Sequence, residues 1–186
     1  MCNDKCVEFG REFLTQDEVE YKDVLEIGSK NINGSLRNII LDMNPSSYIG
    51  IDLEEGDCVD QVCSVYDIIE EFGVEAFDIV ITTEMMEHVE DWRKAINNMK
   101  SVLKPGGIIL ITTRSKGFGF HNYPADYWRY ELSDMEQIFS DFKIEVLKED
   151  TSGQPGVFIK AIKPEIWYQR NLDDIQLYDV RTEIKE

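Results

Sequence analysis

The 186-residue sequence predicts an α/β fold built on a doubly wound, Rossmann-like sheet of seven mostly parallel strands that ends in an antiparallel hairpin. Apolar runs alternate with helix-like segments along most of the chain, which is the pattern of strand–helix–strand units. The runs at residues 76–81 and 108–113 are continuous and rich in β-branched side chains, as in strands buried on both faces of a parallel sheet. Two further runs, at residues 142–147 and 157–162, are joined by a loop with two glycines and a proline, which is typical of a hairpin.

Residues 21–52 contain the first strand–loop–helix–strand unit. An apolar run at residues 24–27 ends at Gly28 and is followed by a polar loop at residues 29–34. A helix-like segment at residues 35–43 comes next. A second apolar run, at residues 48–51, ends at the acid Asp52. Gly28 lets the backbone turn sharply and approach a ligand closely, because glycine has no Cβ. Asp52 stands at the tip of the second strand, where its carboxylate can accept hydrogen bonds from a ribose diol. Such a unit is the nucleoside-binding half of a doubly wound sheet.

Helix signals separate the later strands. Residues 91–103 carry an apolar stripe at helical spacing, and the Pro-Gly-Gly sequence at residues 105–107 is expected to end that helix. The sequence S-D-M-E, from Ser133 to Glu136, matches a capping box and predicts a helix through residue 139. The remaining expected elements are a short helix within residues 1–20, a short third strand at residues 59–62 and a helix at residues 66–72.

These elements predict one folded domain with two appended segments. Residues 21–163 are expected to form the domain, and a chain of this length suits a single core. Residues 1–20 are expected to form an N-terminal helical segment that either caps a ligand cleft or covers an edge of the sheet. Residues 164–186 are polar and mixed, and they predict a tail that forms either a short helix or an extended arm.

Charge and hydropathy narrow the classes of partner. The formal net charge is −18 and the pI is near 4.4, which argues against a nucleic-acid partner, because neutralising phosphates requires clustered Lys and Arg. No apolar run approaches the roughly 20 residues that span a bilayer, so no membrane association is expected. The N-terminus lacks the apolar core of a signal peptide, which predicts a cytoplasmic protein. The oligomeric state is open, with a homodimer as one option.

The four cysteines admit two interpretations. Cys2, Cys6, Cys58 and Cys63 could supply four thiolates to zinc, but structural zinc sites use closer pairs than the Cys58/Cys63 spacing offers. Reduced thiols of a cytosolic protein are the favoured interpretation. The sequence therefore predicts no metal site.

One long segment carries a family resemblance. The sequence FDIVITTEMMEHVEDWRKAINNMKSVLKPGGIILITT, residues 77–113, contains an E-H-V motif followed by L-K-P-G-G. With the acid at the end of YIGID, it resembles the fourth- to fifth-strand block of class I S-adenosylmethionine-dependent methyltransferases. The resemblance covers residues 21–162. The sequence HNYPADYWRYELSDMEQIF, residues 121–139, is similar to a subgroup often found with surface-glycan biosynthesis genes.

The resemblance implies a function and a set of cofactor residues. It implies transfer of a methyl group from S-adenosylmethionine to a small or glycan-linked acceptor, with oxygen as the expected nucleophile. Asp52 matches the ribose-binding acid, Leu53 and Val65 are candidates for the adenine slot, and Glu26 is expected to orient the first loop or the cofactor's amino group. The full set of expected cofactor-binding residues is Glu26, Gly28, Ser29, Asp52, Leu53, Ser64, Val65 and Thr83.

The two histidines are the candidates for proton transfer. His88 follows the fourth strand and His121 lies in the loop at residues 114–130, and an imidazole there could accept a hydroxyl proton. The alternative for His88 is a histidine bonded to backbone at a helix start. The expected acceptor-binding residues are Tyr123, Asp126 and Arg129, and the alternative is that Arg129 simply pairs with Asp126.

Two other functions compete with methyl transfer. The usual acid-x-Gly-x-Gly-x-Gly loop has Lys30 and Ile32 in place of its later glycines, although Gly34 could restore flexibility. That departure would suit a catalytically silent, methyltransferase-like binding subunit. A nicotinamide-dependent dehydrogenase would share the acid at Asp52, but the Gly-x-Gly-x-x-Gly spacing is absent.

Overall fold

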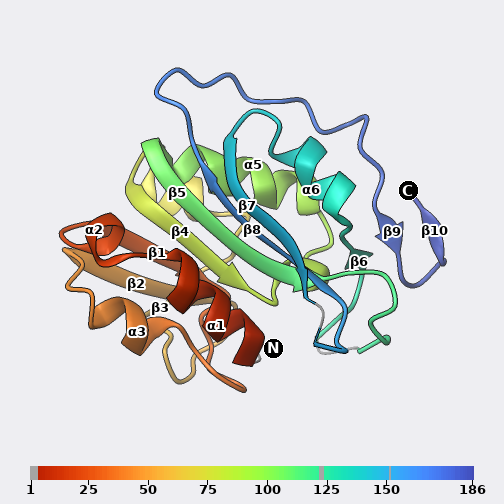
Figure 1. Cartoon of the computed structure of the whole chain (residues 1–186), viewed down its shortest axis with the longest axis horizontal. Coiled ribbons are helices and arrows are strands. Elements are labelled where there is room, and N and C mark those ends of the chain that lie inside the picture. The colour runs from red at the N-terminus through yellow and green to blue at the C-terminus, as the bar shows by residue number, and fades with distance from the viewer. Residues whose placement is uncertain (1–3, 122–123, 151) are drawn as a thin grey trace.

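The computed structural model describes residues 4–121, 124–150 and 152–186. Its centre is a seven-stranded sheet of order β3-β2-β1-β4-β5-β8-β7, in which β8 runs antiparallel to both neighbours and the other pairs are parallel (Figure 1). The strands are β1 (Asp23–Ile27), β2 (Ser47–Asp52), β3 (Gln61–Val62), β4 (Phe77–Thr83), β5 (Leu103–Arg114), β7 (Lys143–Asp150) and β8 (Gly156–Ile162). The predicted doubly wound sheet with its antiparallel hairpin is confirmed.

Helices cover both faces of this sheet. One face carries α1 (Asp4–Phe13), α2 (Gln16–Val19) and α3 (Arg37–Leu41), and the other carries α4 (Ile68–Phe72), α5 (Trp92–Val102) and α6 (Leu132–Ile138). Each face buries its own cluster of apolar side chains. In β4, Ile79 and Ile81 join one cluster and Val80 joins the other. A strand buried on both sides needs apolar residues at every position, which explains its unbroken run.

The Pro-Gly-Gly sequence at residues 105–107 does not end a helix. Helix α5 stops at Val102, and Leu103 already pairs with Phe77 of β4. Residues 105–107 therefore lie in the first part of β5, which begins earlier than predicted. The pairing of β4 with β5 has an irregularity between Phe77 and Ile79, which accommodates this sequence. The expected helix at residues 35–43 is also shorter than predicted, since α3 covers Arg37–Leu41.

The predicted position of the capping box of α6 is wrong by two residues. The helix begins at Leu132, so its N-cap is Glu131 and not Ser133. The side chain of Asp134 accepts a hydrogen bond from the backbone N–H of Glu131 at 3.0 Å, in the role expected of Glu136. A carboxylate pair with the same spacing replaces the Ser/Glu pair, because acids also accept from the free N–H groups of a first turn.

The C-terminal tail is an extended arm, which is one of the two forms expected for it; the other was a short helix. It crosses the upper edge of the sheet and descends beside α6 (Figure 1). There it forms a small antiparallel sheet from β6 (Trp128–Arg129), β9 (Tyr178–Asp179) and β10 (Ile184–Lys185). Strand β6 belongs to the segment at residues 114–130, which was expected to be a loop. In the parts of the chain that the structure describes, no helix combines the length and apolarity needed to cross a membrane.

Candidate active site

A cavity of about 390 Å³ lies at the carboxyl ends of β1, β2 and β4, where the strand order reverses. Its wall also includes His88, together with residues that the sequence analysis did not select, among them Glu84, Met85 and Pro124. All eight residues expected to bind the cofactor line this one cavity: Glu26, Gly28, Ser29, Asp52, Leu53, Ser64, Val65 and Thr83.

The turn after β1 brings the backbone against the cavity. Gly28 has a φ of 75°, in the left-handed region that glycine adopts without strain. The N–H groups of Gly28 and Ser29 both donate to the carbonyl of Ile51, at 2.9 and 3.0 Å. A Cβ on residue 28 would lie 2.8 Å from Cγ of Met85. Both the dihedral angle and the packing therefore require glycine at this position.

Asp52 ties the first loop to the end of β2. Its Oδ2 accepts a hydrogen bond from the N–H of Lys30 at 3.1 Å, and its Oδ1 accepts one from the N–H of Leu53 at 2.7 Å. The side chain is half-buried in the cavity wall. Each carboxylate oxygen has more than one acceptor direction, so the group can still accept bonds from a diol in the cavity.

Glu26 is a buried acid in the floor of the same cavity. It is 2% exposed, and the hydroxyl of Tyr48 donates to its Oε2 at 2.5 Å. Burial raises the pKa of Glu26 to about 7, although the bond from Tyr48 acts in the opposite direction. A cation in the cavity would favour its charged form, so Glu26 can match the charge of a ligand's ammonium group.

The opposite wall is formed by residues 63–66. The N–H of Cys63 donates to the carbonyl of Asp52 at 2.9 Å, and Asn98 of α5 donates to the carbonyls of Val65 and Tyr66 at 3.0 Å each. Leu53 stands at the rim with 64% of its surface exposed. This wall therefore presents backbone groups and an apolar side chain to a flat ring.

The turn after β4 buries two carboxylates, of which Glu84 lines the cavity. Glu84 is 3% exposed and forms an ion pair with the guanidinium of Arg114. Burial, reinforced by the nearby charge of Glu87, raises the pKa of Glu84 well above its usual value. Glu87 is 0% exposed and lies in the short 3₁₀ helix η1 (Met86–His88). Its Oε2 accepts a bond from Oγ1 of Thr113 at 2.9 Å.

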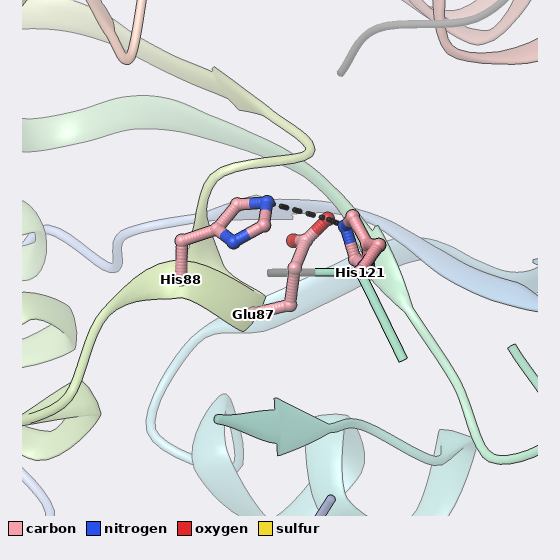
Figure 2. A group of neighbouring side chains, drawn as sticks. All are labelled: Glu87, His88 and His121. Atoms are coloured by element: carbon pink, nitrogen blue, oxygen red, sulfur yellow. Dashed lines mark ion pairs between the residues drawn. The ribbon is translucent and has the colours of Figure 1, made fainter. Parts of the chain in front are cut away.

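His88 and His121 approach the carboxylate of Glu87 from two segments of the chain (Figure 2). Their Nε2 atoms lie 3.8 and 3.9 Å from Oε1 of Glu87. The two rings are 4.8 Å apart at an angle of 70°. Burial lowers the pKa of His121. The structure thus brings the two predicted catalytic histidines together, although they are far apart in the sequence.

Asp126 and Arg129 are bonded to each other. The guanidinium donates to both carboxylate oxygens, at 2.6 and 2.7 Å, and both side chains are almost fully buried. Burial acts to raise the pKa of Asp126, but the bonds from Arg129 outweigh it and the pKa lies below its usual value. Their charged groups face each other and not the cavity. Tyr123, the third expected acceptor-binding residue, lies outside the described residues.

Glu87 is the functional candidate that sequence reasoning missed. It stands inside the E-H-V motif, of which only the histidine was predicted to be a site residue. Its side chain, His88 and His121 offer ligand atoms that all lie within 4.8 Å of one another. Among the described residues, Cys6, Cys58 and Cys63 form no disulfide, and Cys2 lies outside the described residues.

Comparison with known proteins places this geometry in a family. A family model described as a methyltransferase domain matches residues 5–151. The human mitochondrial ubiquinone biosynthesis O-methyltransferase is 45% identical over 56 residues, which are 30% of this chain and 15% of that protein. Phosphoethanolamine N-methyltransferase 2 from Caenorhabditis elegans is 32% identical over 76 residues, which are 38% of this chain and 17% of that protein. The match therefore spans less than a fifth of either relative.

Solved structures share the fold over most of the chain. The 1,6-didemethyltoxoflavin-N1-methyltransferase of Burkholderia thailandensis, with bound 1,6-didemethyltoxoflavin and S-adenosylhomocysteine, superposes with a TM-score of 0.70. The sequence identity is 16%, and the superposition covers 87% of this chain and 80% of that one. At this identity the likeness concerns the fold.

Proposed function

This chain belongs to the family of methyltransferase domains, and from that premise we propose that it transfers a methyl group from S-adenosylmethionine to a small or glycan-linked acceptor at a hydroxyl oxygen. The observation that carries the proposal is a single cavity lined both by Asp52, the acid at the tip of β2, and by His88. The expected resemblance to S-adenosylmethionine-dependent methyltransferases is confirmed for the family, and the surface-glycan subgroup stays a prediction.

The residues around the first loop fit the cofactor. S-adenosylmethionine, when bound, supplies a methyl carbon on a positively charged sulfur. Asp52 has acceptor capacity for the ribose hydroxyls, and Glu26 has a carboxylate for the ammonium group. Leu53 and Val65 offer apolar surface for adenine. The absence of a side chain at Gly28 leaves the backbone close to the ligand.

Ser29 and Thr83 complete the proposed cofactor set. Ser29 is buried beside the first turn, and Thr83 ends β4 in the cavity wall. Ser64 accepts a bond from the N–H of Tyr66 at 3.1 Å, which shapes the wall for the adenine edge. Together these residues would hold the donor in one orientation, and orientation is the main contribution that a protein makes to methyl transfer.

The acceptor would react at the end of the cavity that His88 lines. An alcohol must lose a proton as it attacks, and an imidazole titrates near neutral pH. His88 and His121 are therefore the residues proposed to activate the hydroxyl. Asp126 and Arg129, together with Tyr123, were expected to contact the acceptor directly. The buried ion pair supports a different contribution from the first two, in which they hold the segment that carries His121.

The choice of oxygen rests on the proposed activation and on one relative. The human relative is an O-methyltransferase, whereas the Caenorhabditis elegans relative is an N-methyltransferase. A cytoplasmic protein that acts on a small molecule, without nucleic acid or membrane, agrees with the net charge of −18 and stays a proposal. The similarity of residues 121–139 to glycan-associated enzymes favours a sugar-like acceptor.

Calorimetry with S-adenosylhomocysteine tests the proposal. We expect saturable heat with one site per chain, and release of S-adenosylhomocysteine when S-adenosylmethionine is mixed with the correct hydroxylated acceptor. A screen of nucleotide sugars and phenols for that release would identify the acceptor class. A protein that binds neither S-adenosylmethionine nor S-adenosylhomocysteine would contradict the proposal and favour the silent binding subunit. The 390 Å³ cavity supports the enzyme, because a silent subunit would not need it.

A further inference from the structure

We infer that Glu87, His88 and His121 form a binding site for one divalent transition-metal ion of the Zn²⁺ type, at the acceptor end of the cavity. The three side chains form a two-imidazole, one-carboxylate set (Figure 2). Nitrogen ligands of this kind favour zinc and other first-row transition metals over magnesium. The metal site itself stands on this geometry alone, whereas its role in activating the acceptor rests on the proposed methyl transfer.

The first observation concerns Glu87. Its side chain is 0% exposed, and within the described residues its Oε1 has no hydrogen-bond partner. A buried carboxylate oxygen without a donor is costly, so such atoms are usually bonded to a donor or bound to a metal. The buried Arg114 forms its ion pair with Glu84. A cation at Oε1 of Glu87 would compensate this charge.

The second observation is the orientation of His88. Its Nδ1 forms a hydrogen bond with the backbone carbonyl of Ala125, and a carbonyl can only accept, so Nδ1 carries the proton. Nε2 then has a free lone pair, and this atom is the one that points at Glu87. Metal-binding histidines are commonly fixed in this way, by a bond from the second ring nitrogen to a carbonyl or carboxylate.

His121 likewise places Nδ1 next to an acceptor, the carboxylate of Asp126, without forming the hydrogen bond that His88 makes. Its Nδ1 lies 3.1 Å from Oδ2 of Asp126, although the angle is not that of a formed hydrogen bond, and its Nε2 points at Glu87. The backbone N–H of His121 donates to the same Oδ2 at 2.8 Å. Asp126 is fixed by Arg129. Asp126 thus stands where the carboxylate of a carboxylate–histidine–metal arrangement stands.

The distances from the two imidazoles to Glu87 are too long for hydrogen bonds and close to those between two ligands of one metal ion. At 3.8 and 3.9 Å, neither Nε2 is within hydrogen-bonding reach of Oε1 of Glu87. Ligand atoms about 2.0–2.1 Å from a tetrahedral metal lie roughly 3.3 Å apart, so each of these two nitrogen–oxygen distances would shorten by about half an ångström around an ion, while all three ligand atoms already lie within 4.8 Å of one another. A proton shared between a histidine and Glu87 would require a larger approach, and it would leave the second histidine without a partner at Nε2.

Three protein ligands leave at least one coordination position for a substrate oxygen. His88 lines the cavity, so that position faces the proposed reaction centre. An acceptor hydroxyl bound there becomes more acidic and gives its proton to water. The oxygen then forms its bond to the methyl carbon while the carbon–sulfur bond breaks, and that electron pair neutralises the sulfur. With the ion bound, His88 and His121 would activate the hydroxyl through the metal, and this route replaces direct proton transfer to an imidazole.

Metal titration of the full chain tests the site. After treatment with a chelator, the protein should bind Zn²⁺ with one site in calorimetry, and Co²⁺ should produce the visible absorption of a low-symmetry site. Glu87→Gln, His88→Ala and His121→Ala should each weaken Zn²⁺ binding by more than the roughly 10–100-fold that loss of a supporting residue costs. Glu90→Gln, an exposed acid close in the sequence, should bind like the wild type.

Two further measurements make the outcome decisive. A Cys58→Ser/Cys63→Ser variant should keep the zinc site, and loss of binding there would overturn the inference. Equal Zn²⁺ affinity in wild type and in the His121→Ala variant would overturn it too. S-adenosylhomocysteine affinity separates the two proposals, because His121→Ala should leave it unchanged. Cofactor binding without zinc binding contradicts the metal site, whereas zinc binding without cofactor binding contradicts the proposed function.

Discussion

The two ends of the cavity are built in different ways. The cofactor end consists of turns that follow directly from β1 and β2, and its bonds join backbone groups to Asp52 and Ile51. The proposed acceptor end combines η1 with residues 114–121 and 124–130 and with β9 of the tail. The N–H of Val180 donates to the carbonyl of Tyr127 at 2.8 Å, so the end of the chain helps to fix this region.

This difference extends to the charges. Arg37, which begins α3 after the first loop, forms a two-bond ion pair with Asp60, and both side chains remain partly exposed. Arg129 at the acceptor end forms the same kind of pair with Asp126, and there both side chains are buried. The comparison teaches that the acceptor end depends on a fully buried ion pair and on contacts with the distant C-terminal tail, while the cofactor end combines backbone turns with one buried acid, Glu26. Each prediction below tests that distinction.

Arg129→Ala should have the largest effect. Removing one partner of a buried ion pair leaves the other charge unpaired, at a cost of about 3–5 kcal/mol in the free energy of unfolding. Arg37→Ala is the matched control, and we expect a loss of about 1 kcal/mol, because its pair is solvated. Urea unfolding of the two variants measures both values. Equal losses would show that the two ends do not differ in this respect.

Glu26→Gln should change the pH dependence of stability. The folded-state pKa of about 7 lies above the ordinary value of 4.5 for a glutamate. The native state therefore holds this proton more tightly, and its contribution to stability is complete below pH 4.5 and is lost as the pH rises through 7. The variant lacks this loss, so its stability relative to wild type should rise by about 3 kcal/mol between pH 4.5 and 8. Chemical unfolding at several pH values provides the measurement.

Tyr48→Phe is a control that should change the pH dependence of stability in the opposite direction to Glu26→Gln. The tyrosine hydroxyl stabilises the charged form of Glu26, so its removal should raise the pKa of Glu26 further. The decline in stability should then extend to higher pH. An unchanged pH profile in both variants would show that Glu26 does not titrate in this range.

Asp52→Ala should weaken cofactor binding by about 1.5–3 kcal/mol, because a charge-assisted bond to the ribose would be lost. Asp52→Asn is the matched variant, since an amide oxygen can still accept one backbone bond but carries no charge. Calorimetry with S-adenosylhomocysteine compares the three proteins. Wild-type affinity in the alanine variant would refute the role of Asp52.

The contrast between the two ends also decides what the sequence could predict. The sequence could predict that Gly28 and Asp52 line the cavity, because each stands at the end of a strand and the strands can be recognised from their apolar runs. Glu87 was not singled out, because its proposed role depends on His121, which is 34 residues away in the sequence and lies beside it only in the folded chain. Strand β6 was missed for the same reason, since two residues pair with a tail that lies far along the chain. The capping box of α6 failed because two overlapping acid-containing patterns compete within one turn.

Gly28→Ala is the finest test of local control at the cofactor end. Gly28 and Gly73 both have a positive φ, 75° and 83°, so alanine should be strained by about 1–2 kcal/mol at either position. A Cβ at residue 73 would meet nothing within 4 Å, whereas one at residue 28 would lie 2.8 Å from Cγ of Met85. Gly28→Ala should therefore be less stable than Gly73→Ala by a further 1–3 kcal/mol or so, and it should also lower cofactor affinity. Equal stability with unchanged affinity would mean that Met85 moves aside, and that close packing does not define the first loop.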